Sequence, residues 1–181
     1  SDNWGKKNKV SMNYLFNEVE NTNKNKSRIE NLLPENRFIT ESESDLKSKS
    51  ANHTFNYEIE MEIDSLTTLT IVPNLKRGIS TNRTNSSSIT KNEFGEDLNQ
   101  SNSSDFLNVD TFNFENEFLI ARRFKKKGRS ISLGFENRNS KNETNQLRNS
   151  AAYFFQSATP DDIRNQQINS VSHTDEYTLN A

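Results

Sequence analysis

Apolar and polar residues alternate with a period of two in five segments of this chain. The segments cover residues 10–16, 55–63, 69–75, 112–124 and 131–135. A period of two places successive side chains on opposite faces of a β-strand, whereas a helix would scatter the apolar residues around its axis. We therefore expect five strands, and residues 176–181 look like part of an incomplete sixth strand.

The sharpest alternation lies in residues 55–63, where five apolar residues alternate with polar ones. Three of these polar residues are the glutamates Glu58, Glu60 and Glu62, which would share one face. A strand of a soluble sheet with one wet face has the same pattern. Alternation alone therefore does not distinguish lipid from a second protein layer.

The connections between these segments are of two kinds. Short turns are predicted at residues 64–67 and 125–129, each directly between two alternating segments, and Gly128 can supply the positive φ of a tight turn. The other ends lead into long Asn/Ser/Glu/Lys-rich stretches at residues 18–51, 78–110 and 137–149. These stretches contain turn candidates at 33–36 and 94–97, and residues 40–49 fit a strand that continues with both faces in water.

Short turns on one side and long polar excursions on the other are typical of outer-membrane β-barrels. One up-and-down cycle, from residue 64 to residue 125, is much longer than the strand spacing of about 8–12 residues in a soluble sandwich. The predicted fold is all-β: an antiparallel up-and-down transmembrane β-barrel segment of about five to six long strands. Single-chain barrels have at least about 8 strands, so this segment is expected to be part of a larger wall.

The alternation assigns each strand residue to one of two faces. The predicted lipid-facing band comprises Val10, Met12, Tyr14, Phe16, Phe55, Tyr57, Ile59, Met61, Ile63, Leu69, Ile71, Leu75, Phe112, Phe114, Phe118, Ile120, Phe124, Ile131, Leu133 and Phe135. The predicted lumen-facing polar residues are Asn56, Glu58, Glu60, Glu62, Glu115, Glu117, Arg123 and Glu136. Asn116 and Arg122 are exceptions on the lipid side, and Arg122 is close enough to a short turn to extend its charge to the interface.

Composition limits the other classes of function. The formal net charge is −2, which argues against a polyanion-binding protein driven by bulk charge, and we expect no nucleic-acid partner. The chain has no cysteine, hence neither disulfides nor a thiolate metal site, and no apolar run of about 18 residues that would form a membrane-spanning helix. Asn and Ser make up about 28% of the chain and hydrophobic residues only 30%, yet the 12 Phe residues are many for a disordered protein.

No constellation of residues points to an enzyme, a cofactor or a metal. His53 and His173 are the only histidines, and neither has a partner at ligand spacing. Asp161 and Asp162 follow Pro160 and read as a turn, with a Ca²⁺ site as the alternative. The glutamate row reads as a solvated or plug-contacting face, with a cation-selective stripe as the alternative, and residues 125–129 read as an exposed charged turn rather than a nucleic-acid or headgroup patch.

A succession of short motifs resembles one known family. The motifs are residues 4–7 (WGKK), 13–16 (NYLF), 20–23 (ENTN), 33–34 (LP), 57–58 (YE), 63–65 (IDS), 122–129 (RRFKKKGR) and 161–166 (DDIRNQ). Together they resemble, over nearly the whole chain, the barrel region of the outer-membrane β-barrel family related to TonB-dependent receptors. In that family a signal peptide, a small β-sandwich and a plug domain precede the barrel, so the resemblance makes residues 1–181 an internal segment of one barrel domain.

The resemblance implies the outer membrane of a diderm bacterium as the location. It implies outer-membrane lipid, the remainder of the barrel and its plug as partners, and energised uptake of a polar nutrient through the TonB energy-transducing complex. The alternative is a soluble or cell-surface β-rich adhesin or binding module, in which the alternating face packs against a second sheet.

Overall fold

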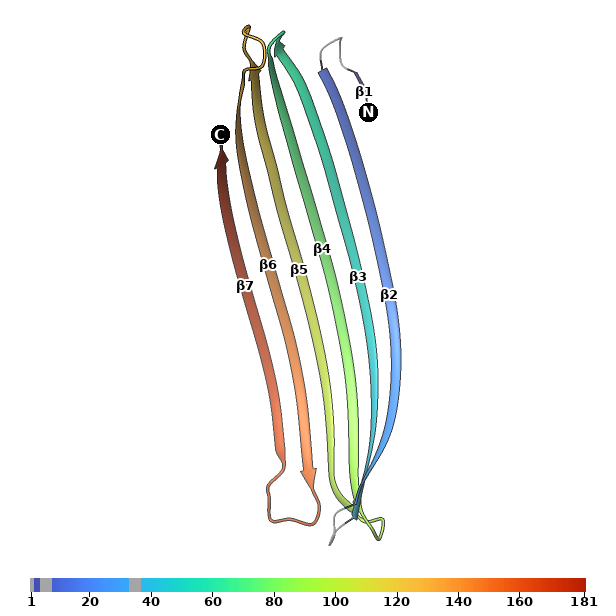
Figure 1. Cartoon of the computed structure of the whole chain (residues 1–181). Helices are drawn as coiled ribbons and strands as arrows, with labels where there is room; N and C mark the ends of the chain where they lie inside the picture. Colours follow the sequence, from blue (N-terminus) through green and yellow to red (C-terminus); the bar gives the residue numbers. More distant parts are fainter. Residues whose placement is uncertain (1, 4–7, 33–36) are drawn as a thin grey trace.

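The computed structural model describes residues 2–3, 8–32 and 37–181, and it shows one antiparallel sheet. The strands follow one another in chain order, so every neighbour in the sheet is also a neighbour in sequence (Figure 1). They are β1 (Asp2–Asn3), β2 (Asn8–Leu32), β3 (Arg37–Asp64), β4 (Thr67–Asn92), β5 (Asp97–Arg123), β6 (Ser130–Phe154) and β7 (Asp162–Asn180). The prediction of an all-β, up-and-down segment with six long strands that does not close is confirmed.

The strand ends are fixed by turn residues. Between β3 and β4, Asp64 accepts hydrogen bonds from the Leu66 N–H at 2.7 Å and the Thr67 hydroxyl at 3.0 Å. The turns at Gly95 and Gly128 use φ values of 82° and 81°, a conformation that costs glycine little. The expected turn at residues 33–36 and the WGKK motif at residues 4–7 lie outside the described residues.

The polar stretches of the sequence are strand rather than loop. β3 alone has 28 residues, which corresponds to about 92 Å at about 3.3 Å per residue. Only about 9–11 residues are needed to cross a bilayer with a tilted strand. More than half of each of the strands β2 to β6 therefore lies outside its alternating segment, as residues 40–49 suggested for β3.

The sheet is a single layer with no interior. Among the described residues, no hydrophobic side chain is buried. The accessible surface is 13281 Å², whereas a compact monomer of 20.9 kDa exposes about 9,000 Å². No helix in the described part of the chain is long and apolar enough to cross a membrane. The sheet therefore has to obtain its apolar contacts from something outside these residues.

Among the described residues, both edges of the sheet lack a neighbour over most of their length. β1 pairs with β2 only at Lys9 and Val10, and β7 pairs only with β6. The long strands bow along their length, and β2 and β7 lie at opposite margins of the sheet (Figure 1). Unpaired backbone groups along such edges favour further strand pairing.

Candidate membrane-facing surface

The strand register defines two faces, because residues directly opposite one another in neighbouring strands point to the same side of a sheet. One pleat row, for example, contains Val10, Ile59 and Ile71, and continues to Phe118 and Phe135. The face that contains this row is called the apolar face below, and the opposite one the polar face.

All of the residues that the sequence assigned to a lipid-facing band lie on the apolar face by this register or by the strand alternation that extends it. They gather at the end of the sheet where the short turns are. Two residues of the last strand, Tyr177 and Leu179, extend the group across β7, since Leu179 lies opposite Phe135. Together these residues form the apolar band, and whether lipid covers it stays a prediction.

The predicted lumen-facing residues lie on the other face. Asn56, Glu58, Glu60 and Glu62 alternate with the band residues of β3, and Glu117 lies directly opposite Glu136. Glu115, Arg123 and Asn56 fall on the same side by the register. The lumen itself is not formed by these strands, so the assignment to a lumen also stays a prediction.

Aromatic contacts connect the strands within the apolar band. The ring centroids of Phe118 and Phe135 are 6.2 Å apart, and those of Phe135 and Tyr177 are 6.4 Å apart. At the other margin the Tyr14 hydroxyl and His53 Nδ1 are hydrogen-bonded at 2.8 Å, and the Phe16 ring lies 4.8 Å from the His53 ring. Such pairs add cross-strand stabilisation beyond the burial of area.

Arg122 lies on the apolar face, at the edge of the band. Its Nη1 donates to the Thr67 hydroxyl at 3.2 Å and is 3.6 Å from Asp64 Oδ2. The pKa of Asp64 is lowered by the hydrogen bond from the Leu66 N–H, by the Thr67 hydroxyl and by the positive charge of Arg122, against an opposing effect of desolvation. The positive charge of Arg122, which the sequence analysis placed on the lipid side, therefore lies at the turn between β3 and β4, where it contacts Thr67 and Asp64.

Asn116 interrupts the band on β5. It lies opposite Pro73 of β4 and Asn137 of β6, and its buried Oδ1 has no hydrogen-bond partner among the described residues. Pro73 has no N–H to donate, and the bridge pattern between β3 and β4 has a gap at this position. Pro73, Asn116 and Asn137 therefore form a local polar interruption of the apolar face.

Beyond the band, the same face becomes charged. Across β2 and β3 the signs of the ion pairs change along the strands. Nearest the band an acid of β2 faces a base of β3, further out bases of β2 face acids of β3, and in the outermost pair an acid of β2 again faces a base of β3. These cross-strand pairs, called the charge ladder below, are Glu18–Lys49, Lys24–Asp45, Lys26–Glu43, Arg28–Glu41 and Glu30–Arg37.

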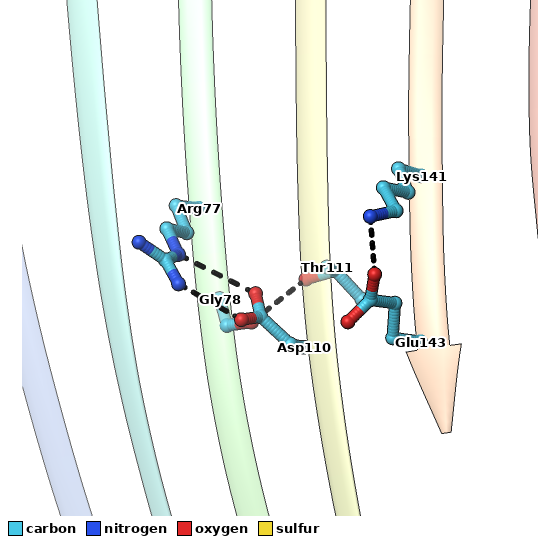
Figure 2. Close-up of polar contacts among 6 residues, drawn as sticks. All are labelled: Arg77, Gly78, Asp110, Thr111, Lys141 and Glu143. Carbon is cyan, nitrogen blue, oxygen red and sulfur yellow. Dashed lines mark hydrogen bonds and ion pairs between the residues drawn. The ribbon is translucent and has the colours of Figure 1, made fainter. Parts of the chain in front are cut away.

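The central strands show the same transition from apolar to charged. Figure 2 shows Arg77 of β4 donating to both carboxylate oxygens of Asp110 on β5, at 3.4 and 2.9 Å. The neighbouring pair on β6 joins Lys141 and Glu143 (Figure 2). Paired charges of this kind are suited to water or to a headgroup region, because removing them from both would cost several kcal/mol per ion.

The polar face has polar contacts both beside the band and further out, although the register also places Leu15, Val72 and Leu119 on it. Asn56 accepts from Asn74, and Lys9 lies 3.3 Å from Glu60. Further out, Asp105 accepts from Gln146 at 2.9 Å and from Arg148 at 2.8 Å. The hydrogen bond from Gln146, with that from Arg148 and its charge, lowers the pKa of Asp105 against the effect of desolvation.

The charge ladder and the two band residues of β7 were missed in the sequence. A signal for the ladder was present: Lys24, Lys26 and Arg28 precede residues 33–36 at about the same distance at which Glu41, Glu43 and Asp45 follow them. Blocks of opposite charge at equal distances on the two sides of a predicted turn indicate cross-strand ion pairs in a hairpin.

The structure assembles no metal-binding cluster from the described residues. They contain no group of three or more His, Asp or Glu side chains that could hold a metal ion. His53 is engaged with Tyr14 and Phe16, and His173 lies opposite Lys141.

Comparison with known proteins identifies no family. No family model matches the chain, and no curated protein matches it. Among solved structures, the membrane pore complex of pneumolysin is similar over 94% of this chain and 31% of that one, at 7% identity and a TM-score of 0.22. The chain thus spans about a third of that protein's length. So low a TM-score supports no conclusion, and the reading of the site depends on its own geometry.

Proposed function

We propose that this chain forms part of the wall of an outer-membrane β-barrel. The observation that supports this most directly is the apolar band: large hydrophobic side chains gather on one face of a sheet that buries none of them among the described residues. In water such a surface would be costly, since each Å² of exposed apolar area costs about 25 cal/mol. In a bilayer the same surface is satisfied by acyl chains.

The dimensions of the band agree with a bilayer. On β3 it runs from Phe55 to Ile63, about 27 Å along the strand, and it runs from Phe112 of β5 to Phe124, the residue after the end of β5, over about 41 Å. At a tilt of about 40° these lengths become about 21 and 31 Å of height, on either side of the band of about 25 Å in known barrels.

The open edges support a wall rather than a complete barrel. Backbone groups that face acyl chains have to be paired, because no water is present to replace a missing strand. Among the described residues, β7 has an unpaired margin at the level of the band, and the margin of β2 is paired there only at Lys9 and Val10. We therefore place further strands of the same barrel at both margins.

Uptake of a polar nutrient is the activity we propose for the complete barrel, with TonB coupling. The family resemblance of the sequence supports the coupling, and the hydroxyl-, amide- and carboxylate-lined polar face supports a water-filled or plugged interior. The polar outer parts of the strands would then stand outside the membrane, where they could contact glycans or peptides.

Single-cysteine labelling tests the membrane assignment, and the chain has no native cysteine to interfere. Ile59→Cys and Glu60→Cys are adjacent on β3 but point to opposite faces. Ile89→Cys lies on the apolar face of β4, beyond the band. Each variant is labelled with an environment-sensitive fluorophore in the intact protein folded into liposomes, and quenched by a lipid-attached or a water-soluble quencher.

We expect the lipid-attached quencher to act on the label at residue 59 alone, and the aqueous quencher to act on the labels at residues 60 and 89. An adhesin or other soluble module predicts a different result: the label at residue 59 would be shielded from both quenchers by a second sheet, and the protein would stay monodisperse without detergent. Either finding would end the barrel proposal.

A further inference from the structure

The turn between β5 and β6 concentrates positive charge at one end of the sheet. Six of the eight residues at 122–129 are Lys or Arg, and this segment is called the basic turn below. Its backbone is closed by a hydrogen bond from the Phe124 N–H to the Arg129 carbonyl at 2.9 Å. Gly128, with φ of 81°, allows the chain to reverse.

This charge is not neutralised by neighbouring acids. Within the basic turn only Arg122 has an acidic partner, Asp64. The other basic residues of the turn make no ion pair with any described residue; they are Arg123, Lys125, Lys126, Lys127 and Arg129. Most basic residues of the strands, by contrast, are paired, including those of the charge ladder.

The basic turn also forms a concave surface. A cavity of about 500 Å³ lies against it, lined by Leu66 and Phe124 and otherwise by basic residues of the turn. A cluster of cations around a partly apolar hollow is suited to a ligand that has an anionic group attached to an apolar body.

The cavity adjoins the apolar band. Phe124 is 47% exposed and belongs to the band, and the nearby band residues Ile131 and Ile120 are 58% and 40% exposed. Ile131 lies directly opposite Arg122 in the register. An acyl chain lying along these side chains would therefore bring its phosphate to the basic turn.

The sequence alone favoured an exposed charged turn over a headgroup site at residues 125–129. From the unpaired charge and the adjoining cavity we propose instead that the basic turn binds the phosphate headgroup of an anionic phospholipid in the leaflet that surrounds the short turns. This inference rests on the proposed membrane function. Four to eight Lys or Arg residues next to a membrane-spanning segment attract anionic lipid, each contributing about fivefold in affinity near the surface. The contact between cavity and band selects a lipid over free phosphate, because a free ion gains nothing from Phe124 or Leu66.

The test uses the intact protein folded in maltoside micelles, which contain no phosphate. It is titrated with dihexanoyl phosphatidylglycerol, with phosphatidylcholine of the same chain length and with glycerol 3-phosphate, and bound lipid is counted by native mass spectrometry. The variant Lys125→Gln/Lys126→Gln/Arg129→Gln removes three charges of the turn.

The matched control, Lys47→Gln/Lys76→Gln/Arg83→Gln, removes three basic charges that also lack an ion pair with described residues but lie elsewhere. The single variant Lys126→Gln replaces the triple variant if the latter does not fold.

We expect phosphatidylglycerol to bind at least tenfold more tightly than phosphatidylcholine or glycerol 3-phosphate. The triple turn variant should lose about 100-fold of that affinity, Lys126→Gln about fivefold, and the control less than twofold. Any one of three results would overturn the headgroup site while leaving the barrel wall intact. The two lipids would bind equally tightly, the control variant would lose as much affinity as the turn variant, or glycerol 3-phosphate would bind as tightly as phosphatidylglycerol. A protein that stays folded and monodisperse in water without detergent would overturn both.

Discussion

The substitution Ile71→Arg measures whether the apolar band faces lipid. Ile71 lies near the middle of the band on β4, between Ile59 and Phe118 in the same pleat row. Ile89 is on the same strand and the same face, eighteen residues further out, which is about 60 Å away. Both isoleucines are partly exposed, so the two positions differ mainly in their distance from the short turns.

An arginine on the lipid side of a barrel at the bilayer midplane lowers the free energy of unfolding by about 2–4 kcal/mol. The same arginine costs close to zero where that face is in water. We therefore expect Ile71→Arg to lower the free energy of unfolding by about 2–4 kcal/mol and Ile89→Arg to change it by less than about 0.5 kcal/mol. The assay is reversible unfolding of the intact protein in guanidinium chloride in the presence of liposomes, with β-sheet circular dichroism as the probe.

Ile71→Ala separates the charge from the loss of apolar contact. It should cost about 2 kcal/mol, from one methylene and two methyl groups at about 0.8 kcal/mol each, and any further loss in Ile71→Arg is the cost of the charge. If Ile71→Arg and Ile89→Arg destabilise the protein equally, the face is uniform along the strand, and the reasoning that assigns a lipid zone to the band is refuted.

Three further predictions follow from contacts outside the band. Lys26→Glu should lower stability by about 0.5 kcal/mol through like-charge contact with Glu43, and adding Glu43→Lys should restore it, as measured by a double-mutant cycle. Gly78→Ala should lower stability by about 1–3 kcal/mol, because a Cβ would lie 2.8 Å from both the Asn52 side-chain oxygen and the Thr111 hydroxyl, and adding Asn52→Ala together with Thr111→Ala should relieve most of this in equilibrium unfolding. The lowered pKa of Asp105 stabilises the fold above about pH 4, and this contribution is lost as the pH falls through the lower folded-state pKa, so Asp105→Asn should flatten acid unfolding in that range.

Each of these has a result that would contradict it. If the double variant Lys26→Glu/Glu43→Lys does not recover the stability lost in Lys26→Glu, the charge ladder does not form ion pairs in solution. If Gly78→Ala is as stable as the unmodified protein, the side chains next to Gly78 on the neighbouring strands must move apart enough to make room for the added Cβ. An unchanged acid unfolding curve for Asp105→Asn would mean that Gln146 and Arg148 do not hold the carboxylate in its ionised form.

The sequence was sufficient where one face of a strand is apolar. Residues 55–63 alternate without exception, and the strand, its face and the turn at 64–67 could all be predicted from them. The outer parts of the strands were harder, because both faces are polar there and no period of two survives. Ser86–Ser88, for instance, has no pattern that distinguishes strand from loop, although Ser86 and Ser88 are each hydrogen-bonded to a serine of β5.

Pairwise features could not be predicted from residue types alone. The unsatisfied Asn116 and the gap beside Pro73 depend on which residues the register brings together. Register is set by the pairing of whole strands and by turn geometry, and a shift of one residue would reverse the faces. The hollow at the basic turn likewise depends on Leu66, which comes from a different hairpin.

The up-and-down order of the strands also limits how the number of strands in such a sheet can change. Asn8 at the start of β2 lies opposite Met61, and Asn180 at the end of β7 lies opposite Gly134, so both are at the level of the short turns. A complete hairpin can therefore be duplicated or deleted without reversing the direction of any remaining strand. Loss of a single strand, by contrast, would reverse every strand that follows, so the hairpin is the unit in which sheets of this kind can vary in size.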